Sequence, residues 1–294
     1  MANFCFVDDS VSGVGGTALT LDAIVEPEKE NVDFISTSDF SLKDSFSDYD
    51  CFILGNITAF NQNSLGAILS MMESRKFVKI EFDYGYCPYR GRIPHQRLAG
   101  EKCDCPFSKK SNNHLSEIYN LIKYKSSHVF YMSEGQMKIH NDDLLSINSK
   151  KKSVLSSCFL PEDMLLMESL SKKQKNDKHA IIDGKGGWHS EAKGIQNSID
   201  YAEKNKIEYD LIKTETHREM LNLLSNYKGL INKPIIHDTC PRVTIEAKLM
   251  GLDLIIDEMS QHITESWWKQ VPNKVAKYIS GRPAYFWKKI KCLN

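Results

Sequence analysis

The chain has 294 residues, of which 41% are hydrophobic, so it is long and apolar enough for two domains with separate cores. Its 38 basic and 38 acidic residues cancel, which excludes a global attraction to nucleic acid or to an acidic membrane. No stretch approaches the roughly 20 successive apolar residues of a membrane span, and no basic leader precedes an apolar run at the N-terminus. We therefore expect a cytoplasmic protein without a membrane span, whose eight cysteines stay reduced.

The first half of the chain alternates short apolar runs with helix-like stretches. An apolar run at residues 3–7 leads into a glycine-rich turn, which is followed by helical spacing over residues 17–25. Further predicted strands cover residues 32–36, 50–56 and 76–82, and a predicted helix covers residues 64–74. This alternation is typical of βαβ units on a parallel sheet.

The pattern loosens between residues 141 and 177, where polar and charged residues predict a domain boundary near Asn176. A second α/β series follows, with strands predicted at residues 179–184, 209–214, 229–234 and 253–258 and helices at residues 191–205, 217–227 and 243–252. We predict an N-terminal domain over residues 1–176, a C-terminal domain over residues 177–270 and a helical tail over residues 271–294 that packs back on the first domain.

The segment from Pro234 to Glu258 carries the strongest functional signal. A loop after a predicted strand leads directly into a helix, where unpaired backbone N–H groups and the helix dipole favour an anion such as a diphosphate. Asp238 lies in the loop, and Glu246 follows eight positions later in the helix. One carboxylate is thereby predicted to face a ribose and the other a sugar, unless the segment is an ordinary surface loop before an amphipathic helix.

This D-x7-E spacing, followed by AKLMGLDLII, resembles the E-x7-E signature of retaining GT-B glycosyltransferases. The resemblance implies an α/β fold of two Rossmann-like domains that face each other across a cleft. It also implies that Asp238 contacts the donor sugar, as a catalytic residue, and that Glu246 contacts the ribose. Two positions depart from the signature, because Asp238 replaces a glutamate and Asp253 stands where proline is usual.

A glycine-rich loop after the first strand of the second half supplies cations for the donor. In the same family a basic pair in this loop, an arginine and the lysine of a later Lys-Gly, neutralises the donor phosphates. Lys193 and Gly194 resemble the Lys-Gly, and Lys185 replaces the usual arginine. Thr239 and Arg242 are further candidates for donor contacts, and a salt bridge to Asp238 is the alternative for Arg242.

A second glycine loop, after the first strand of the chain, contains Gly15 and Gly16. Its spacing fits neither the dinucleotide-binding G-x-G-x-x-G pattern nor a P-loop. It resembles the G-G loop of many GT-B enzymes, which implies that Gly15 and Gly16 approach the donor, and a plain tight turn is the alternative.

A third group follows the strand at residues 76–82. Glu81 and Asp83 are two positions apart, so on a strand they share one face, and they are candidate catalytic carboxylates at a carboxyl end where α/β folds bind ligands. The pattern E-x-D-x-x-Y-C-x-Y-R resembles uncharacterised phage-type glycosyltransferases, which implies that Tyr86 and Arg90 bind the acceptor. The alternative is that Arg90 or Arg92 simply neutralises the acids.

Four potential zinc ligands, Cys87, His95, Cys103 and Cys105, lie in the loop that follows. Their spacing differs from the usual C-x2-C pairs, so we rank free thiols above zinc, and a zinc ion here is expected to be structural only.

Together these features predict a glycosyltransferase that uses a nucleoside-diphosphate sugar as donor and requires no cofactor. Its acceptor is an open choice, and a hydroxymethylated pyrimidine in DNA is one candidate, in which case the enzyme acts in the cytoplasm of a phage host. Candidate basic residues for DNA are Lys109, Lys110, Lys123, Lys125 and Lys150 to Lys152. The alternatives are a non-catalytic nucleic-acid or partner-binding protein on a degenerate GT-B scaffold, and another sugar-nucleotide enzyme such as an epimerase.

Overall fold

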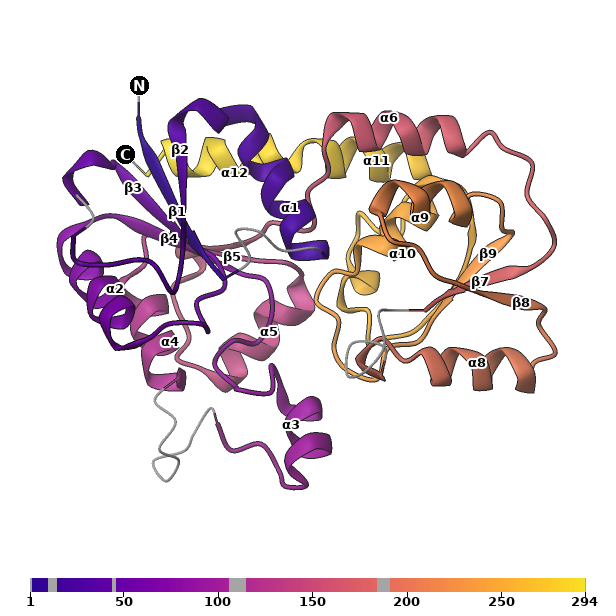
Figure 1. Ribbon diagram of the computed structural model, residues 1–294, viewed down its shortest axis with the longest axis horizontal. Helices are drawn as coiled ribbons and strands as arrows, with labels where there is room; N and C mark the ends of the chain where they lie inside the picture. Colours follow the sequence, from indigo (N-terminus) through magenta and orange to yellow (C-terminus); the bar gives the residue numbers. More distant parts are fainter. Residues whose placement is uncertain (1, 10–14, 44–45, 106–114, 184–190, 294) are drawn as a thin grey trace. The chain divides into compact units, whose positions relative to one another are not determined.

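The structure is a computed structural model that describes residues 2–9, 15–43, 46–105, 115–183 and 191–293. The chain forms two units (Figure 1). Unit 1 comprises Met1–Cys158 and Arg282–Asn294, and unit 2 comprises Phe159–Gly281. Each unit has its own parallel sheet, so the predicted α/β class with two Rossmann-like domains is confirmed.

The sheet of unit 1 has six parallel strands in the order β2-β1-β3-β4-β5-β6. The strands are β1 (Phe4–Asp8), β2 (Val32–Ser36), β3 (Cys51–Leu54), β4 (Phe77–Glu81), β5 (His128–Tyr131) and β6 (Lys152–Val154). Every residue of β1, β3, β4 and β5 is buried. These strands are continuous apolar runs in the sequence because helices cover both faces of a parallel sheet.

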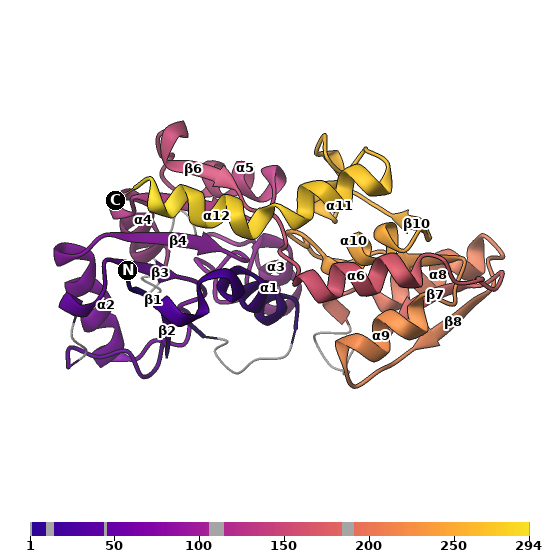
Figure 2. The same cartoon turned by 90° about the horizontal axis from the view of Figure 1, so that it is seen from above.

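Helices lie on both faces of this sheet (Figures 1 and 2). One face carries α1 (Gly16–Val25) and α12 (Arg282–Lys291), and the other carries α2 (Gln62–Ser74), α4 (Leu115–Lys125) and α5 (Glu134–Asp143). Helix α3 (Arg92–Ala99) lies in the connection between β4 and α4. Short 3-10 helices are η1 (Glu26–Asn31), η2 (Phe46–Asp48) and η3 (Ser149–Lys151).

The C-terminal helix α12 packs back on unit 1, as predicted. The Trp287 indole donates a hydrogen bond of 2.6 Å to the Ile24 carbonyl of α1, and its ring lies 4.9 Å from the ring of Phe4 in β1. The Arg282 guanidinium donates a hydrogen bond of 2.7 Å to the Leu155 carbonyl. The last residues of the chain therefore complete the core of the first unit.

The sheet of unit 2 has four parallel strands in the order β10-β9-β7-β8. The strands are β7 (His179–Ile182), β8 (Tyr209–Ile212), β9 (Gly229–Asn232) and β10 (Asp253–Ile256). The helices are α6 (Pro161–Leu170), α8 (Ile195–Lys204), α9 (His217–Leu224), α10 (Arg242–Leu249), η4 (Gln261–Thr264) and α11 (Pro272–Ser280). Its buried core includes Ile181, Ala202 and Ile231.

The units divide at a different place from the boundary drawn near Asn176. Helix α6 precedes that position, yet it packs against α9, α10 and α11 and so lies in unit 2. Helix α11, which begins at Pro272, also lies in unit 2. Of the predicted tail at residues 271–294, only the part from Arg282 onward lies in unit 1.

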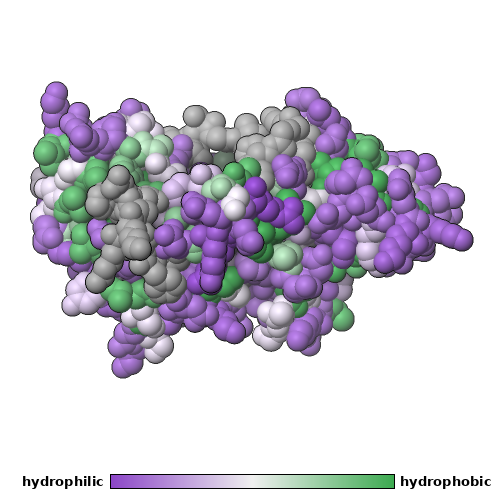
Figure 3. Space-filling model, turned by 90° about the horizontal axis from the view of Figure 1, so that it is seen from below, coloured by the Kyte–Doolittle hydropathy of each residue, from purple (hydrophilic) through white to green (hydrophobic). Residues whose placement is uncertain are grey.

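The surface of unit 2 in Figure 3 is largely hydrophilic. The outer side of α8 contributes to it, with Gln196, Asp200 and Lys204 exposed while Ser198 and Ala202 face the core. Among the described residues, none of the helices combines the length and the apolar character that crossing a membrane requires.

Two glycines of unit 1 give a matched test of close packing. A Cβ on Gly55 would lie 2.0 Å from Oδ2 of Asp8, whereas a Cβ on Gly66 in α2 meets nothing within 4 Å. We expect Gly55→Ala to destabilise the protein by about 2 kcal/mol through overpacking, and Gly66→Ala to stabilise it by about 1 kcal/mol through helix propensity. Urea unfolding measures both, and equal effects of the two changes would contradict this packing.

Candidate functional site

The order of the strands in unit 2 marks a place for a ligand. From β7 the chain crosses to β8 on one side, while β9 lies on the other side of β7. Such a switch leaves a crevice outside the carboxyl ends of the two strands, where open α/β sheets bind ligands. The loop after β7 includes residues 184–190, so the predicted phosphate ligand Lys185 lies outside the described residues.

Two predicted donor-site residues form an ion pair in the segments that follow these strands. Nζ of Lys193, before α8, lies 2.5 Å from Oδ2 of Asp238, which is in the loop after β9. The Lys193 side chain is 58% exposed and the Asp238 side chain 13%. The Asp238 amide donates to the Met259 carbonyl at 2.8 Å, and the Asp238 carbonyl accepts from the Gln261 amide at 3.0 Å. The carboxylate is therefore held by a fixed backbone, and the ammonium is accessible.

Backbone contacts fix the position of Lys193. Gly194 caps α8 in a left-handed conformation with φ of 66°, and a Cβ there would lie 1.9 Å from the Lys233 carbonyl oxygen. The Lys233 side chain forms a 3.2 Å ion pair with Asp257 and lies 4.6 Å from the centre of the Tyr201 ring. Lys233 is thus a second cation at these strand ends, which the sequence analysis did not select.

A buried charge cluster holds two further predicted donor-site residues, Arg242 and Glu246. They are one turn apart on α10, with the Arg242 Nε 3.4 Å from Oε1 of Glu246. His217 Nε2 lies 2.8 Å from the same oxygen, and Asp163 Oδ2 lies 3.6 Å from the Arg242 guanidinium. The guanidinium also lies 3.9 Å from the centre of the Phe159 ring.

The alternative of a salt bridge from Arg242 to Asp238 is not what forms: Arg242 pairs with Asp163 and Glu246, and Asp238 pairs with Lys193. The Glu246 side chain is only 1% exposed. Burial raises the pKa of Asp163, while His217 and Arg242 oppose that shift. Thr239, another predicted donor contact, lies in the same loop as Asp238 and is half-buried.

A buried histidine follows Gln261, whose amide donates to the Asp238 carbonyl. His262 in η4 is fully buried, with Nε2 3.3 Å from Oγ1 of Thr244, and its ring lies 5.7 Å from Trp267 and 4.4 Å from Trp268. Burial lowers the pKa of His262 to about 3, with opposition from Asp238. His262 is therefore neutral in the folded protein at any pH near 7.

This neutral histidine predicts acid sensitivity of unit 2. Above pH 6.5 His262 is neutral in the folded and the unfolded protein. Below pH 6.5 only the unfolded chain binds a proton at His262, so the free energy of unfolding decreases as the pH is lowered. The loss at pH 5 is about 2 kcal/mol. We expect His262→Gln to reduce the pH dependence of unfolding, followed by tryptophan fluorescence in urea at pH 5 and 7.5. Thr244→Val is the control, since it removes the partner but keeps the histidine, and an unchanged pH dependence in His262→Gln would refute the assignment.

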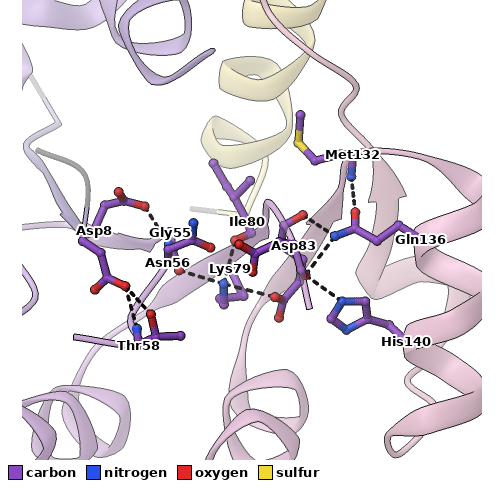
Figure 4. A network of polar contacts seen from close by, with 12 residues as sticks. Asp8, Gly55, Asn56, Thr58, Lys79, Ile80, Asp83, Met132, Gln136 and His140 are labelled. Carbon is purple, nitrogen blue, oxygen red and sulfur yellow. Dashed lines mark hydrogen bonds and ion pairs between the residues drawn. The ribbon is translucent and has the colours of Figure 1, made fainter. Parts of the chain in front are cut away.

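Unit 1 has its own polar network at the carboxyl ends of β1, β3 and β4 (Figure 4). The Asn56 amide donates to the buried Asp8 carboxylate at 2.6 Å, and the amide and hydroxyl of Thr58 donate to Asp9 at 2.8 and 2.7 Å. The fully buried Lys79 donates to the Gly55 carbonyl at 2.7 Å. These contacts tie the ends of three neighbouring strands together.

The predicted catalytic acids Glu81 and Asp83 lie in this network. Glu81 is buried and lies 3.3 Å from the Lys79 ammonium. Their backbone carbonyls accept hydrogen bonds of 2.9 and 3.1 Å from the Gln136 amide, and His140 Nε2 lies 3.0 Å from the Asp83 carbonyl (Figure 4). Burial raises the pKa of both acids, and Lys79 opposes the shift at Glu81 while Arg90 opposes it at Asp83.

Arg90 and Tyr86, the predicted acceptor ligands, have different environments. The exposed Arg90 forms a 2.6 Å ion pair with Asp83, which is the structural alternative considered from the sequence. Tyr86 is fully buried, and its hydroxyl hydrogen-bonds to the Asp143 carboxylate, which also pairs with Arg92. Arg90 is therefore accessible to a ligand, while Tyr86 is part of the core.

Several buried polar atoms near these acids have no hydrogen-bond partner among the described residues. They are Oε1 of Glu81, Oδ1 of Asp83, the hydroxyls of Tyr119 and Tyr131, and Nδ1 of His140. Because buried polar groups are normally paired, this concentration indicates a place for ordered water or a polar ligand.

The remaining predicted residues are placed as follows. Gly15 and Gly16 are exposed at the start of α1, after the end of β1. The DNA-binding role considered for Lys123 is wrong, because its fully buried ammonium donates a hydrogen bond of 3.0 Å to the His140 carbonyl. Lys125 is paired with Glu73 at 2.6 Å, and Lys109 and Lys110 lie outside the described residues.

Comparisons with known proteins add the fold family. No family model and no curated protein matches the sequence. The solved structure of Anabaena Alr3699/HepE in complex with UDP and glucose aligns with 97% of this chain and 94% of its own, with a TM-score of 0.54 and 14% identity. The chain has the GT-B fold.

Two further solved structures align with lower scores. An α-glucosyltransferase in complex with UDP and a 13-mer DNA containing a HMU base covers 88% of this chain and 81% of its own, with a TM-score of 0.49 and 10% identity. The apo structure of OtsA covers 96% and 94%, with a TM-score of 0.49 and 8% identity.

Proposed function

We propose that the protein is a glycosyltransferase that takes a sugar from a nucleoside diphosphate, which binds to unit 2. The observation that carries this proposal is the accessible Lys193–Asp238 pair at the carboxyl ends of β7 and β9. The N-terminus of α10, four residues after Asp238, adds backbone N–H groups that favour the same anion. The GT-B fold supports this placement of the donor.

In the proposed reaction, an acceptor oxygen forms a bond to the anomeric carbon while the bond from that carbon to the diphosphate oxygen breaks. The acceptor proton leaves to a base, and the diphosphate departs with an added negative charge. Lys193 turns from Asp238 to the diphosphate and stabilises this charge. Asp238 is then free to accept hydrogen bonds from the sugar hydroxyls.

Glu246 has an indirect role in this scheme. Because its carboxylate is buried and already contacts His217 and Arg242, we assign it the positioning of Arg242 and of the start of α10 rather than the direct ribose contact that the resemblance implies. For the acceptor we propose Asp83 and Arg90 of unit 1, with Glu81 holding Lys79 in place.

UDP-glucose is the first donor to test, since HepE binds UDP and glucose. Calorimetry with UDP and hydrolysis of UDP-glucose measure binding and turnover. We expect Lys193→Ala to weaken UDP binding about 10-fold, the loss of one charge-assisted hydrogen bond. Asp238→Asn should reduce turnover more than UDP binding, because its proposed partner is the sugar.

Lys204→Ala is the matched control, since this exposed lysine lies at the other end of α8 from Lys193. It should bind UDP as the wild type does. If no nucleoside diphosphate stabilises the protein at millimolar concentration, the donor site is wrong. Binding without turnover of any sugar nucleotide would favour the alternative of a non-catalytic protein on this scaffold.

We further propose retention at the anomeric carbon, from the D-x7-E resemblance, and a hydroxymethylated pyrimidine in DNA as one acceptor. The exposed Lys150, in η3 of unit 1, is the described lysine that suits DNA best. With about three phosphate contacts, duplex affinity should fall roughly 40-fold between 50 and 200 mM salt.

Fluorescence anisotropy with hydroxymethylated duplex DNA tests this acceptor. Lys150→Ala should lower the slope of log affinity against log salt by about one, and Lys204→Ala should leave it unchanged. Binding that is absent or independent of salt would remove DNA from the candidate acceptors.

A further inference from the structure

Four metal-binding side chains of unit 1 converge between β4 and α4. Cys87 follows β4, His95 lies on α3, and Cys103 and Cys105 follow that helix. All four side chains are buried, and their potential ligand atoms lie within 4.8 Å of one another. None of these cysteines forms a disulfide.

Three of the six distances between these atoms match those of a tetrahedral metal site. With Zn–S of about 2.3 Å and Zn–N of about 2.05 Å, a tetrahedron has S···S edges of about 3.8 Å and S···N edges of about 3.6 Å. The distance from Cys87 Sγ to Cys103 Sγ is 3.9 Å. His95 Nδ1 lies 3.5 Å from Cys87 Sγ and 3.3 Å from Cys105 Sγ. A disulfide would instead need about 2.05 Å between sulfurs.

We propose that Cys87, His95, Cys103 and Cys105 bind one zinc ion. The three thiols lose their protons on binding, and the imidazole coordinates as a neutral ligand through Nδ1. Its other nitrogen, Nε2, lies 3.9 Å from the Glu101 carboxylate, which is beyond hydrogen-bond distance. Since four protein ligands fill a tetrahedral site, the ion is structural.

The site explains how this connection holds an unusual backbone. Arg90 and Gly91 have φ of 57° and 135°, and Gly100 has φ of 72°. A left-handed arginine is unfavourable and persists only where its surroundings hold it. Ligands on both sides of α3 would clamp the turn that carries Arg90 and the segment around Tyr86. The sequence identified these four residues but ranked zinc below free thiols, because their spacing is not that of the usual C-x2-C pairs.

Metal analysis of the wild-type protein tests the proposal. The protein is expressed with zinc in the medium, passed over a chelating resin and analysed by mass spectrometry for metals. We expect about one zinc per chain, released when a mercurial reagent blocks the thiols. Replacement by cobalt should give the visible bands of a tetrahedral thiolate complex. Less than about 0.1 zinc per chain together with no such bands would overturn the proposal.

A matched pair of variants locates the ion. Cys105→Ala should lose most of the zinc, whereas Cys158→Ala, which truncates a buried cysteine of unit 1 outside the cluster, should keep it. Zinc retained in Cys105→Ala would show that the ion is elsewhere. If Cys105→Ala does not fold, the wild-type zinc content and cobalt spectrum still decide the question. The result is independent of the proposed transferase activity.

Discussion

Charge buried within or beside the parallel sheets is the constraint on which both units depend. A strand that is covered on both faces has no room for a charge unless a partner and hydrogen bonds come with it. In unit 1, Lys79 meets this condition with Glu81 and the carbonyls of Gly55 and Ile80. In unit 2, α10 and α9 bring Glu246, Arg242 and His217 together. The polar groups thus follow from the topology, which brings the ends of the strands to one edge.

The strands and the fold class could be predicted because buried parallel strands are continuous apolar runs. The runs at residues 50–56 and 179–184 correspond to β3 and β7 for this reason. The boundary between the units was harder to predict from the sequence. Helix α6 belongs to unit 2 because it packs on α9, α10 and α11, and the composition of a segment does not show which helices it will contact. A polar linker at residues 171–178 gave a stronger compositional signal than the true change of partners at Phe159.

The residues of the candidate site could be predicted where they are close together in the sequence, but not where they come from segments far apart in the sequence. The spacing of Asp238 and Glu246 is visible in the sequence, but Asp163 and His217, which complete the charge cluster, come from two other helices. Lys79 did leave a signal, since a lysine inside an apolar strand, two positions from a glutamate, shares a buried face with it. Such a lysine indicates a buried ion pair and deserves the same weight as the acids.

The Lys193–Asp238 pair and the charge cluster around Glu246 differ in what a ligand must overcome to use them. Removing a partner from a buried pair leaves an uncompensated charge and costs about 3–5 kcal/mol. The group around Glu246 is of this kind, so it is suited to hold the shape of α10. An exposed ion pair stabilises a protein by at most about 1 kcal/mol. Lys193 is 58% exposed and Asp238 is 13% exposed, so the pair lies between these two limits. Under the proposed function, this lower cost favours the Lys193–Asp238 pair over the buried group around Glu246 as the contact that opens for an anion.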